Sequence, residues 1–242
     1  EHEFSNVKLV NLSRDNRINI TLEDGKAFHL LEIPETLMDV DYLISVTKLK
    51  THVDQRMSCA LKNQFGLIPK KHKSVFHPFL SEVLYDVNSL FPPDLCIVDG
   101  IVGMEGFGPT DGSPKKAGIV IFGTSAVATD IVAAKVIGFK PKQVPYLKYV
   151  MKKSKYKEDN FEVISEFSSL EVNFDFISLK LYLIGRMGLR LQRWSFYLSN
   201  FGELVQMGRS ALGLIGYKTI AAKVSWKDRI RIAKKMVFKF NG

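Results

Sequence analysis

The chain has 242 residues, of which 46% are hydrophobic and 24% are charged, a balance typical of globular proteins. It excludes a disordered, collagenous or coiled-coil chain, and the length predicts one or two domains. The sequence contains no run of about 18 apolar residues, so no membrane-spanning helix is predicted. The start Glu1-His2-Glu3 does not resemble a signal peptide. Cys59 and Cys96 are too few to ligate an iron–sulfur cluster by themselves, so we expect a reducing, cytoplasmic setting.

The positive charge is concentrated toward the C-terminus. The formal net charge is +9, yet residues 176–242 alone hold 13 Lys and Arg against two acidic residues. Residues 1–175 therefore have a small net negative charge. This asymmetry favours a basic segment that meets an acidic partner. The alternative is a solvated basic face on a segment that packs against the rest of the protein.

Apolar patterns predict the strands. Alternation of apolar and polar residues indicates half-buried strands near the N-terminus, with Asp24-Gly25 as a hairpin turn. Short continuous apolar runs further along are typical of strands buried on both faces of a parallel sheet. The expected strands are 7–12, 17–22, 27–33, 42–46, 95–98 and 119–122, with one more at 161–167.

Apolar residues at helical spacing predict helices over 79–90 and 126–137 and a short helix over 146–151. Because strands alternate with helices, residues 1–170 are expected to form an α/β domain with a mostly parallel or mixed sheet and flanking helices. Residues 171–242 are expected to form a basic, amphipathic helical segment.

Polar side chains follow the fourth predicted strand. Lys48, Lys50 and His52 come first, and Lys62 and Asn63 follow about ten residues later. In open α/β sheets, ligands bind beyond the carboxyl ends of strands. Lysine suits a carboxylate or phosphate, and histidine transfers protons near neutral pH. These residues predict an anion-binding mouth, and the alternative is an ordinary solvated basic loop.

A glycine-rich segment follows the predicted strand at 95–98, which indicates a backbone that turns tightly or approaches a ligand closely. The four glycines expected to line a site are Gly103, Gly106, Gly108 and Gly112. Asp99 and Glu105 supply two carboxylates, which could bind a divalent cation or act as acid and base. The spacing matches neither of the standard phosphate-binding loops, and the alternative is a structural loop.

Thr124 and Ser125 follow the predicted strand at 119–122 and begin the next predicted helix. A hydroxyl at this position caps the helix, and the free backbone amides favour an anion. Asp130 lies about 1.4 turns into the helix, where it could face the same crevice. We therefore expect the three clusters to converge on one cleft. The alternative is a plain helix cap with Asp130 in solvent.

Together these motifs resemble the prokaryotic domain-of-unknown-function family 362. The resemblance rests on Lys48-Leu49-Lys50-Thr51-His52, Lys62-Asn63-Gln64-Phe65-Gly66 with His77, residues 99–114 and residues 127–130. The chain departs from the family pattern at Thr47, Phe107 and Ser125-Ala126, where the family usually has Pro, Asn and Asp-Pro. Many members carry ferredoxin-type cysteine motifs and a longer N-terminal part. The resemblance implies the fold and the position of a site, but no particular reaction.

Two classes of function follow. The first is an enzyme that acts on an anionic small molecule, in which His52 or His77 transfers a proton and Asp99 and Glu105 bind a metal or act as base. The alternative is a non-catalytic module that docks on an acidic partner or an anionic membrane surface through its basic tail. Nucleic acid is less favoured, because the tail has no recognisable nucleic-acid-binding motif. The sequence predicts neither a cofactor nor an oligomeric state.

The tail is expected to form two amphipathic helices. In the first, Arg186, Arg190 and Arg193 form one stripe at helical spacing. A second, apolar stripe consists of Leu183, Met187, Leu191, Trp194, Leu198 and Phe201. Residues 227–240 repeat this design. Basic amphipathic helices with aromatic residues lie in membrane interfaces. The alternative is that the apolar stripes pack on the core and leave the arginines in solvent.

Overall fold

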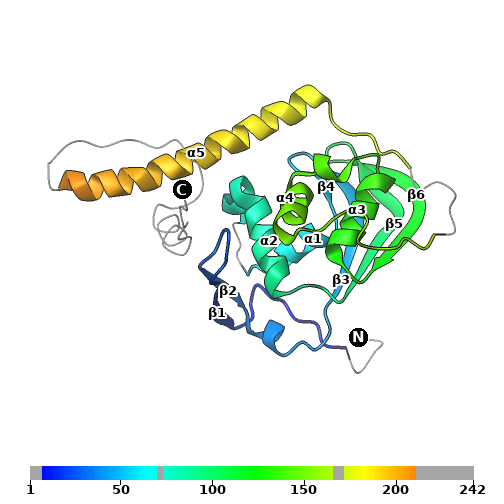
Figure 1. Ribbon diagram of the computed structural model, residues 1–242, viewed down its shortest axis with the longest axis horizontal. Coiled ribbons are helices and arrows are strands. Elements are labelled where there is room, and N and C mark those ends of the chain that lie inside the picture. Colours follow the sequence, from blue (N-terminus) through cyan, green and yellow to red (C-terminus); the bar gives the residue numbers. More distant parts are fainter. Residues whose placement is uncertain (1–6, 70–72, 166–171, 211–242) are drawn as a thin grey trace.

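The computed structural model describes residues 7–69, 73–165 and 172–210. Figure 1 shows an α/β body, a small two-stranded hairpin beside it, and a long C-terminal helix, α5 (Leu179–Ser210), that extends beyond the body. The predicted mixed α/β class is therefore confirmed. The helices of the body are α1 (Ala60–Asn63), α2 (Leu80–Leu90), α3 (Ala126–Val136) and α4 (Pro145–Ser154). The 3-10 helices are η1 (Glu35–Met38), η2 (Gln64–Leu67), η3 (Lys73–Phe79) and η4 (Pro141–Gln143).

The central sheet has the order β4-β3-β5-β6 and mixed strand directions. Its strands are β3 (Ile44–His52), β4 (Arg56–Ser58), β5 (Leu95–Glu105) and β6 (Ser113–Gly123). β3 and β5 run parallel, whereas β4 and β6 are antiparallel to their neighbours. Because β5 and β6 form a hairpin, the carboxyl end of β6 lies beside the amino end of β5, where Gly123 is opposite Cys96.

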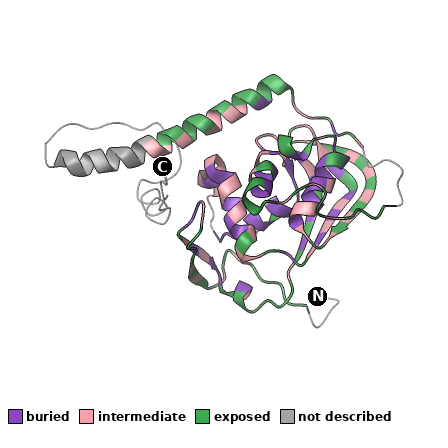
Figure 2. Cartoon of the chain, in the orientation of Figure 1, coloured by how far each residue is buried: buried purple, intermediate pink, exposed green. Residues whose placement is uncertain are grey.

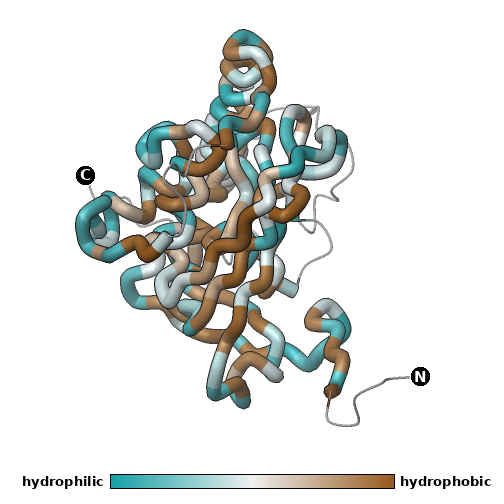
Figure 3. Tube along the Cα trace, turned by 90° about the vertical axis from the view of Figure 1, so that its right-hand side faces the viewer, coloured by the Kyte–Doolittle hydropathy of each residue, from teal (hydrophilic) through white to brown (hydrophobic). Residues whose placement is uncertain are grey.

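One face of this sheet carries the core. Alternate residues of a strand point to opposite faces; Leu49 and Val98 are fully buried, whereas Val46 and Phe122 are more than 60% exposed. Figure 2 shows the buried residues concentrated where the helices meet the sheet. Figure 3 shows apolar strands lying open on the side turned toward the viewer. The helices thus cover one face, and the other face is exposed in the described part of the chain.

The predicted N-terminal hairpin forms from β1 (Arg17–Thr21) and β2 (Leu30–Pro34), which pair antiparallel. Its connecting loop is held by Asp86 of α2, whose buried carboxylate accepts the backbone N–H groups of residues 26–28 at 2.7–3.0 Å. Three amide donors on one carboxylate are a strong, charge-assisted contact. The hairpin is therefore tied to the body through α2.

Three strand predictions differ from the structure. Residues 7–11 have no regular structure and are exposed, with no partner strand among the described residues. Residues 99–105 are strand rather than loop, because they continue β5 between β3 and β6. Residues 161–165 form no strand, and the rest of that prediction lies outside the described residues.

A buried carboxyl group joins α1, α3 and α4. Asp130 is fully buried; its carboxylate accepts the hydroxyl of Tyr146 at 2.8 Å and the backbone N–H of Leu61 at 3.4 Å. Burial raises the pKa of Asp130 to about 7, against the opposing effect of these hydrogen bonds. Asp130 therefore lies in the core, contrary to the expectation that it faces an open crevice.

The raised pKa of Asp130 predicts how stability depends on pH. The folded chain binds a proton between about pH 4 and 7 that the unfolded chain releases, so this group's contribution to stability falls as the pH rises through that window. The variant Asp130→Asn is permanently neutral and keeps an acceptor for Tyr146. We therefore compare the free energies of unfolding of variant and wild type by urea unfolding. The variant's value minus the wild-type value should increase by a few kcal/mol as the pH rises from 4 to 8. The exposed variant Asp41→Asn is the control, and parallel pH profiles for Asp130→Asn and wild type would contradict the assignment.

Candidate functional site

Four of the predicted site residues gather at the carboxyl end of β3. Lys50 and His52 end this strand, Lys62 lies on α1, and His77 lies on η3. Burial lowers the pKa values of His52, Lys62 and His77, and repulsion from neighbouring cations of the group lowers each further. We call these four residues the Lys/His cluster. The structure thus brings together four of the residues that the sequence analysis assigned to one site.

His52 is held as a neutral ring. It is buried, and its Nδ1 accepts the backbone N–H groups of Asp54 at 3.2 Å and Gln55 at 3.4 Å. Burial, with repulsion from Lys62 and His77, lowers the pKa of His52 to about 3. A neutral imidazole that accepts at Nδ1 carries its proton on Nε2. Near neutral pH the ring can donate one hydrogen bond from Nε2 but has no charge.

Lys62 is a largely buried cation of the cluster. Burial and repulsion from Lys50 lower the pKa of Lys62 to about 8, and its ammonium group lies 6.0 Å from the centre of the Phe65 ring. An anion beside this ammonium would raise the pKa again, so anion binding and protonation of Lys62 are coupled.

Asn63 has a structural role next to this cluster. Its side-chain amide donates to Ser45 Oγ at 3.0 Å and to the carbonyl oxygen of Val46 at 3.2 Å. These bonds fasten α1 to β3, and they fix the position from which the neighbouring Lys62 projects.

The two candidate metal carboxylates are separated and paired. Asp99 forms an ion pair with Lys48 on the open face of the sheet. Glu105 pairs with Lys115 at 3.4 Å and accepts the backbone N–H of Asp175 at 2.8 Å. Six residues of β5 separate the carboxylates, roughly 20 Å in an extended strand, so they do not share a cation as expected. Within residues 7–69, 73–165 and 172–210, no group of three or more His, Cys, Asp or Glu is arranged to hold a metal.

Close packing explains three of the four glycines of the predicted site loop, and backbone conformation explains the fourth. A Cβ at Gly103 would lie 2.7 Å from the ring of Phe174, and those at Gly108 and Gly112 would lie 2.1 and 2.3 Å from backbone carbonyl oxygens. Gly106 has a φ of +77°, which favours glycine. These contacts account for the glycine-rich sequence through the β5–β6 hairpin itself.

Thr124 and Ser125 lie at the other end of the sheet. Ser125 caps α3 by accepting the backbone N–H of Ala128 at 3.3 Å, as predicted. Because β6 is antiparallel to β5, however, the start of α3 lies where β5 begins, beside Cys96. The three clusters therefore do not converge on one cleft, and that expectation is wrong.

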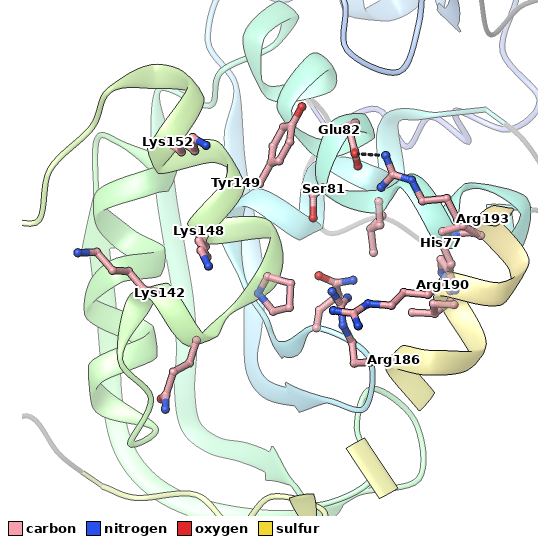
Figure 4. A pocket seen from close by; sticks show the side chains of 16 residues that line it. His77, Ser81, Glu82, Lys142, Lys148, Tyr149, Lys152, Arg186, Arg190 and Arg193 are labelled. Carbon is pink, nitrogen blue, oxygen red and sulfur yellow. Dashed lines mark hydrogen bonds and ion pairs between the residues drawn. The ribbon is translucent and has the colours of Figure 1, made fainter. Parts of the chain in front are cut away.

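A pocket of about 450 Å³ adjoins the Lys/His cluster, with which it shares His77. It lies between η3 and α2 on one side, α4 on another and α5 on a third (Figure 4). Besides His77, its lining includes the charged residues Glu82, Lys142, Lys148, Lys152, Arg186, Arg190 and Arg193. Six Lys and Arg thus face one carboxylate, and we call this the cationic pocket.

The arginine stripe of α5 faces the body. Arg193 pairs with Glu82 at 2.8 Å, and the rings of Phe196 and Tyr197 pack edge-on against Phe79 with centres 5.0 and 5.8 Å away. These contacts hold α5 against η3 and α2, and they bring the preceding turns of the helix to the cationic pocket.

The apolar stripe of α5 points away from the body. Leu183, Met187, Leu191 and Trp194 are each 55–66% exposed, so these four residues do not follow the alternative in which the apolar stripe packs on the core. In the part of the chain that the structure describes, no helix has the length and apolar character needed to cross a membrane. The predicted contacts of Leu198, Phe201 and residues 227–240 lie outside the described side chains.

Sequence reasoning missed the lysines of the cationic pocket. Lys142, Lys148 and Lys152 lie in a segment that reads as a surface connection with a short helix. The available signal was the arginine stripe of α5, whose helical spacing gathers three charges on one side. The helical spacing does not indicate, however, that the arginine side of α5 faces α4.

The comparisons with known proteins agree with the motifs. The thylakoid-associated protein sll1697 of Synechocystis is 32% identical over 129 residues, which are 50% of this chain and 40% of that relative. The aligned region thus spans less than half the length of this relative. No solved structure matches the chain. The family model described as Domain of unknown function (DUF362) matches residues 2–135. Since this match covers more than half of the 242 residues, the chain belongs to the DUF362 family.

Proposed function

We propose that the protein binds an anionic small molecule, a phosphate or carboxylate compound, in the cationic pocket. The observation that carries this proposal is the charge around about 450 Å³ of open space. Pockets of this size hold small organic ligands. An anionic occupant is the simplest way to balance the lining charges.

The pocket's only lining carboxylate is already engaged. Glu82 is paired with Arg193, which leaves five Lys and Arg side chains without an ion-pair partner among the described residues. They are Lys142, Lys148, Lys152, Arg186 and Arg190. A bound anion would place negative charge among these side chains and form charge-assisted hydrogen bonds with them.

His77 is the group placed to exchange a proton with this ligand. It lines the cationic pocket and belongs to the Lys/His cluster. Burial and repulsion from Lys62 lower the pKa of His77, which keeps the ring neutral at pH 7. A neutral imidazole accepts a proton from an acidic ligand group, and this is the role that we propose for it.

Inorganic phosphate tests anion binding directly. Phosphate in excess over its Kd should raise the Tm of the wild type, because a ligand at 100 times its Kd adds about 2.7 kcal/mol of stability. The variant Lys148→Ala/Arg190→Ala should lose most of this shift, and the exposed variant Lys116→Ala on β6 should keep it. Equal Tm shifts in all three proteins, at constant ionic strength, would place the bound anion elsewhere.

We also propose, as a second function, that the protein associates with an anionic membrane surface through the outward face of α5. The supporting observation is the exposed row Leu183, Met187, Leu191 and Trp194. Lys180, one turn before Leu183 on the same side of α5, is exposed, whereas the three arginines turn toward the body. A helix with an exposed apolar face inserts into the lipid interface, and a basic residue near anionic lipid adds about 1 kcal/mol. The relative's name, thylakoid-associated, gives that protein a membrane setting.

Vesicle co-sedimentation tests this second proposal. The wild type should bind vesicles that contain phosphatidylglycerol, bind pure phosphatidylcholine weakly, and be released by salt. Met187→Glu/Leu191→Glu should lower binding by about tenfold or more, because it places two charges in the apolar face. Ile164→Glu, which alters an apolar residue that is 93% exposed outside α5, should bind like the wild type. Wild-type protein that stays in the supernatant with anionic vesicles at low salt would refute membrane association.

A further inference from the structure

We infer that the ligand of the cationic pocket is a polyphosphate, a molecule with two or more linked phosphate groups that spans from α4 to α5. The inference rests on the anion-binding function proposed above and narrows its ligand. It follows from the number of Lys and Arg side chains that line the pocket and from their distribution over two walls, α4 and α5.

Each wall presents its charges one helical turn apart. Lys148 and Lys152 are four residues apart on α4, and Arg186 and Arg190 are four residues apart on α5. Four residues of α-helix correspond to roughly 6 Å. Figure 4 shows Arg186 and Arg190 on one side of the pocket and Lys148 and Lys152 on the other. The pocket thus has two facing cation rows with open space between them.

A compact monoanion does not match this arrangement. One phosphate that contacts the arginines of α5 leaves the lysines of α4 without a partner across a pocket of about 450 Å³. A chain of phosphates places separate negative charges opposite each row. Arginine binds phosphate oxygens in a bidentate fork and lysine binds them as a point charge, so the two walls supply complementary contacts.

The same geometry makes the ligand a clamp for α5. The ion pair between Arg193 and Glu82 joins α5 to the body, and the other two arginines of the stripe line the pocket opposite the lysines of α4. A polyphosphate between the walls would pair with both rows and hold α5 to α4. Occupancy of the pocket should therefore be visible as protection of α5, as well as in the binding isotherm.

Calorimetric titration with orthophosphate, pyrophosphate and tripolyphosphate at fixed pH and ionic strength tests the inference. We expect tripolyphosphate to bind at least about tenfold more tightly than orthophosphate, with pyrophosphate between them. Tripolyphosphate should also slow proteolysis of α5 more than orthophosphate does. Lys148→Ala/Lys152→Ala should remove this preference while leaving orthophosphate binding to α5, because one wall then remains.

Two further variants distinguish the effect of losing positive charge on α5 from the effect of a perturbed fold. Arg186→Lys/Arg190→Lys keeps the positive charge on α5 and should retain the preference, whereas Arg186→Gln/Arg190→Gln should abolish it. Lys116→Ala, outside the pocket, should leave it unchanged. Equal affinity for all three phosphates would overturn the polyphosphate inference and leave anion binding standing. Failure of all three to bind would overturn both. A preference for tripolyphosphate that survives the α4 double variant would also overturn the bridging geometry.

Discussion

The direction of one strand determines where chemistry is located in this protein. β3 and β5 are parallel, so the ends of both strands lie at the same edge of the sheet. β6 is the second strand of a hairpin and runs antiparallel to β5. The residues that follow β6 therefore lie at the opposite edge of the sheet. Lys50 and His52 end β3 near α1 and η3, whereas the reversal of β6 places Thr124 and Ser125 away from that neighbourhood.

Local patterns predicted much of the fold but not that reversal. The strands near 17–22, 42–46, 95–98 and 119–122 and the cap at Ser125 form where the sequence indicates. An apolar run has the same appearance in a parallel or antiparallel strand, so the direction of β6 was not readable. The glycines after residue 98 were ambiguous in a second way. Glycine is needed where the backbone approaches a ligand, and it is equally needed where the backbone packs closely against Phe174 or backbone carbonyl groups, as it does here.

The candidate site depends on contacts between distant segments, and for this reason only part of it was predictable. The Lys/His cluster comes from short motifs that can be recognised in the sequence. The lysines of α4 become part of a candidate site only because α5 lies opposite them. Amphipathicity left open which side of α5 meets the body, and the structure turns the arginine side toward it. The physical reason is that Glu82 and the ring of Phe79 offer Arg193 an ion pair and a stacking surface, with the guanidinium 4.9 Å from the ring centre.

The ion pair between Lys48 and Asp99 has a consequence for the open face of the sheet. It lies beside Val46 and next to Val120 in the strand register, on a face that also exposes Ile44 and Phe122. A second sheet stacked there would strip water from both charges, a desolvation cost that an ion pair rarely recovers. Charges within an exposed apolar sheet discourage indiscriminate association. The ion pair therefore disfavours nonspecific association of another sheet with this face. A specific partner that binds there must provide polar groups that hydrogen-bond to Lys48 and Asp99.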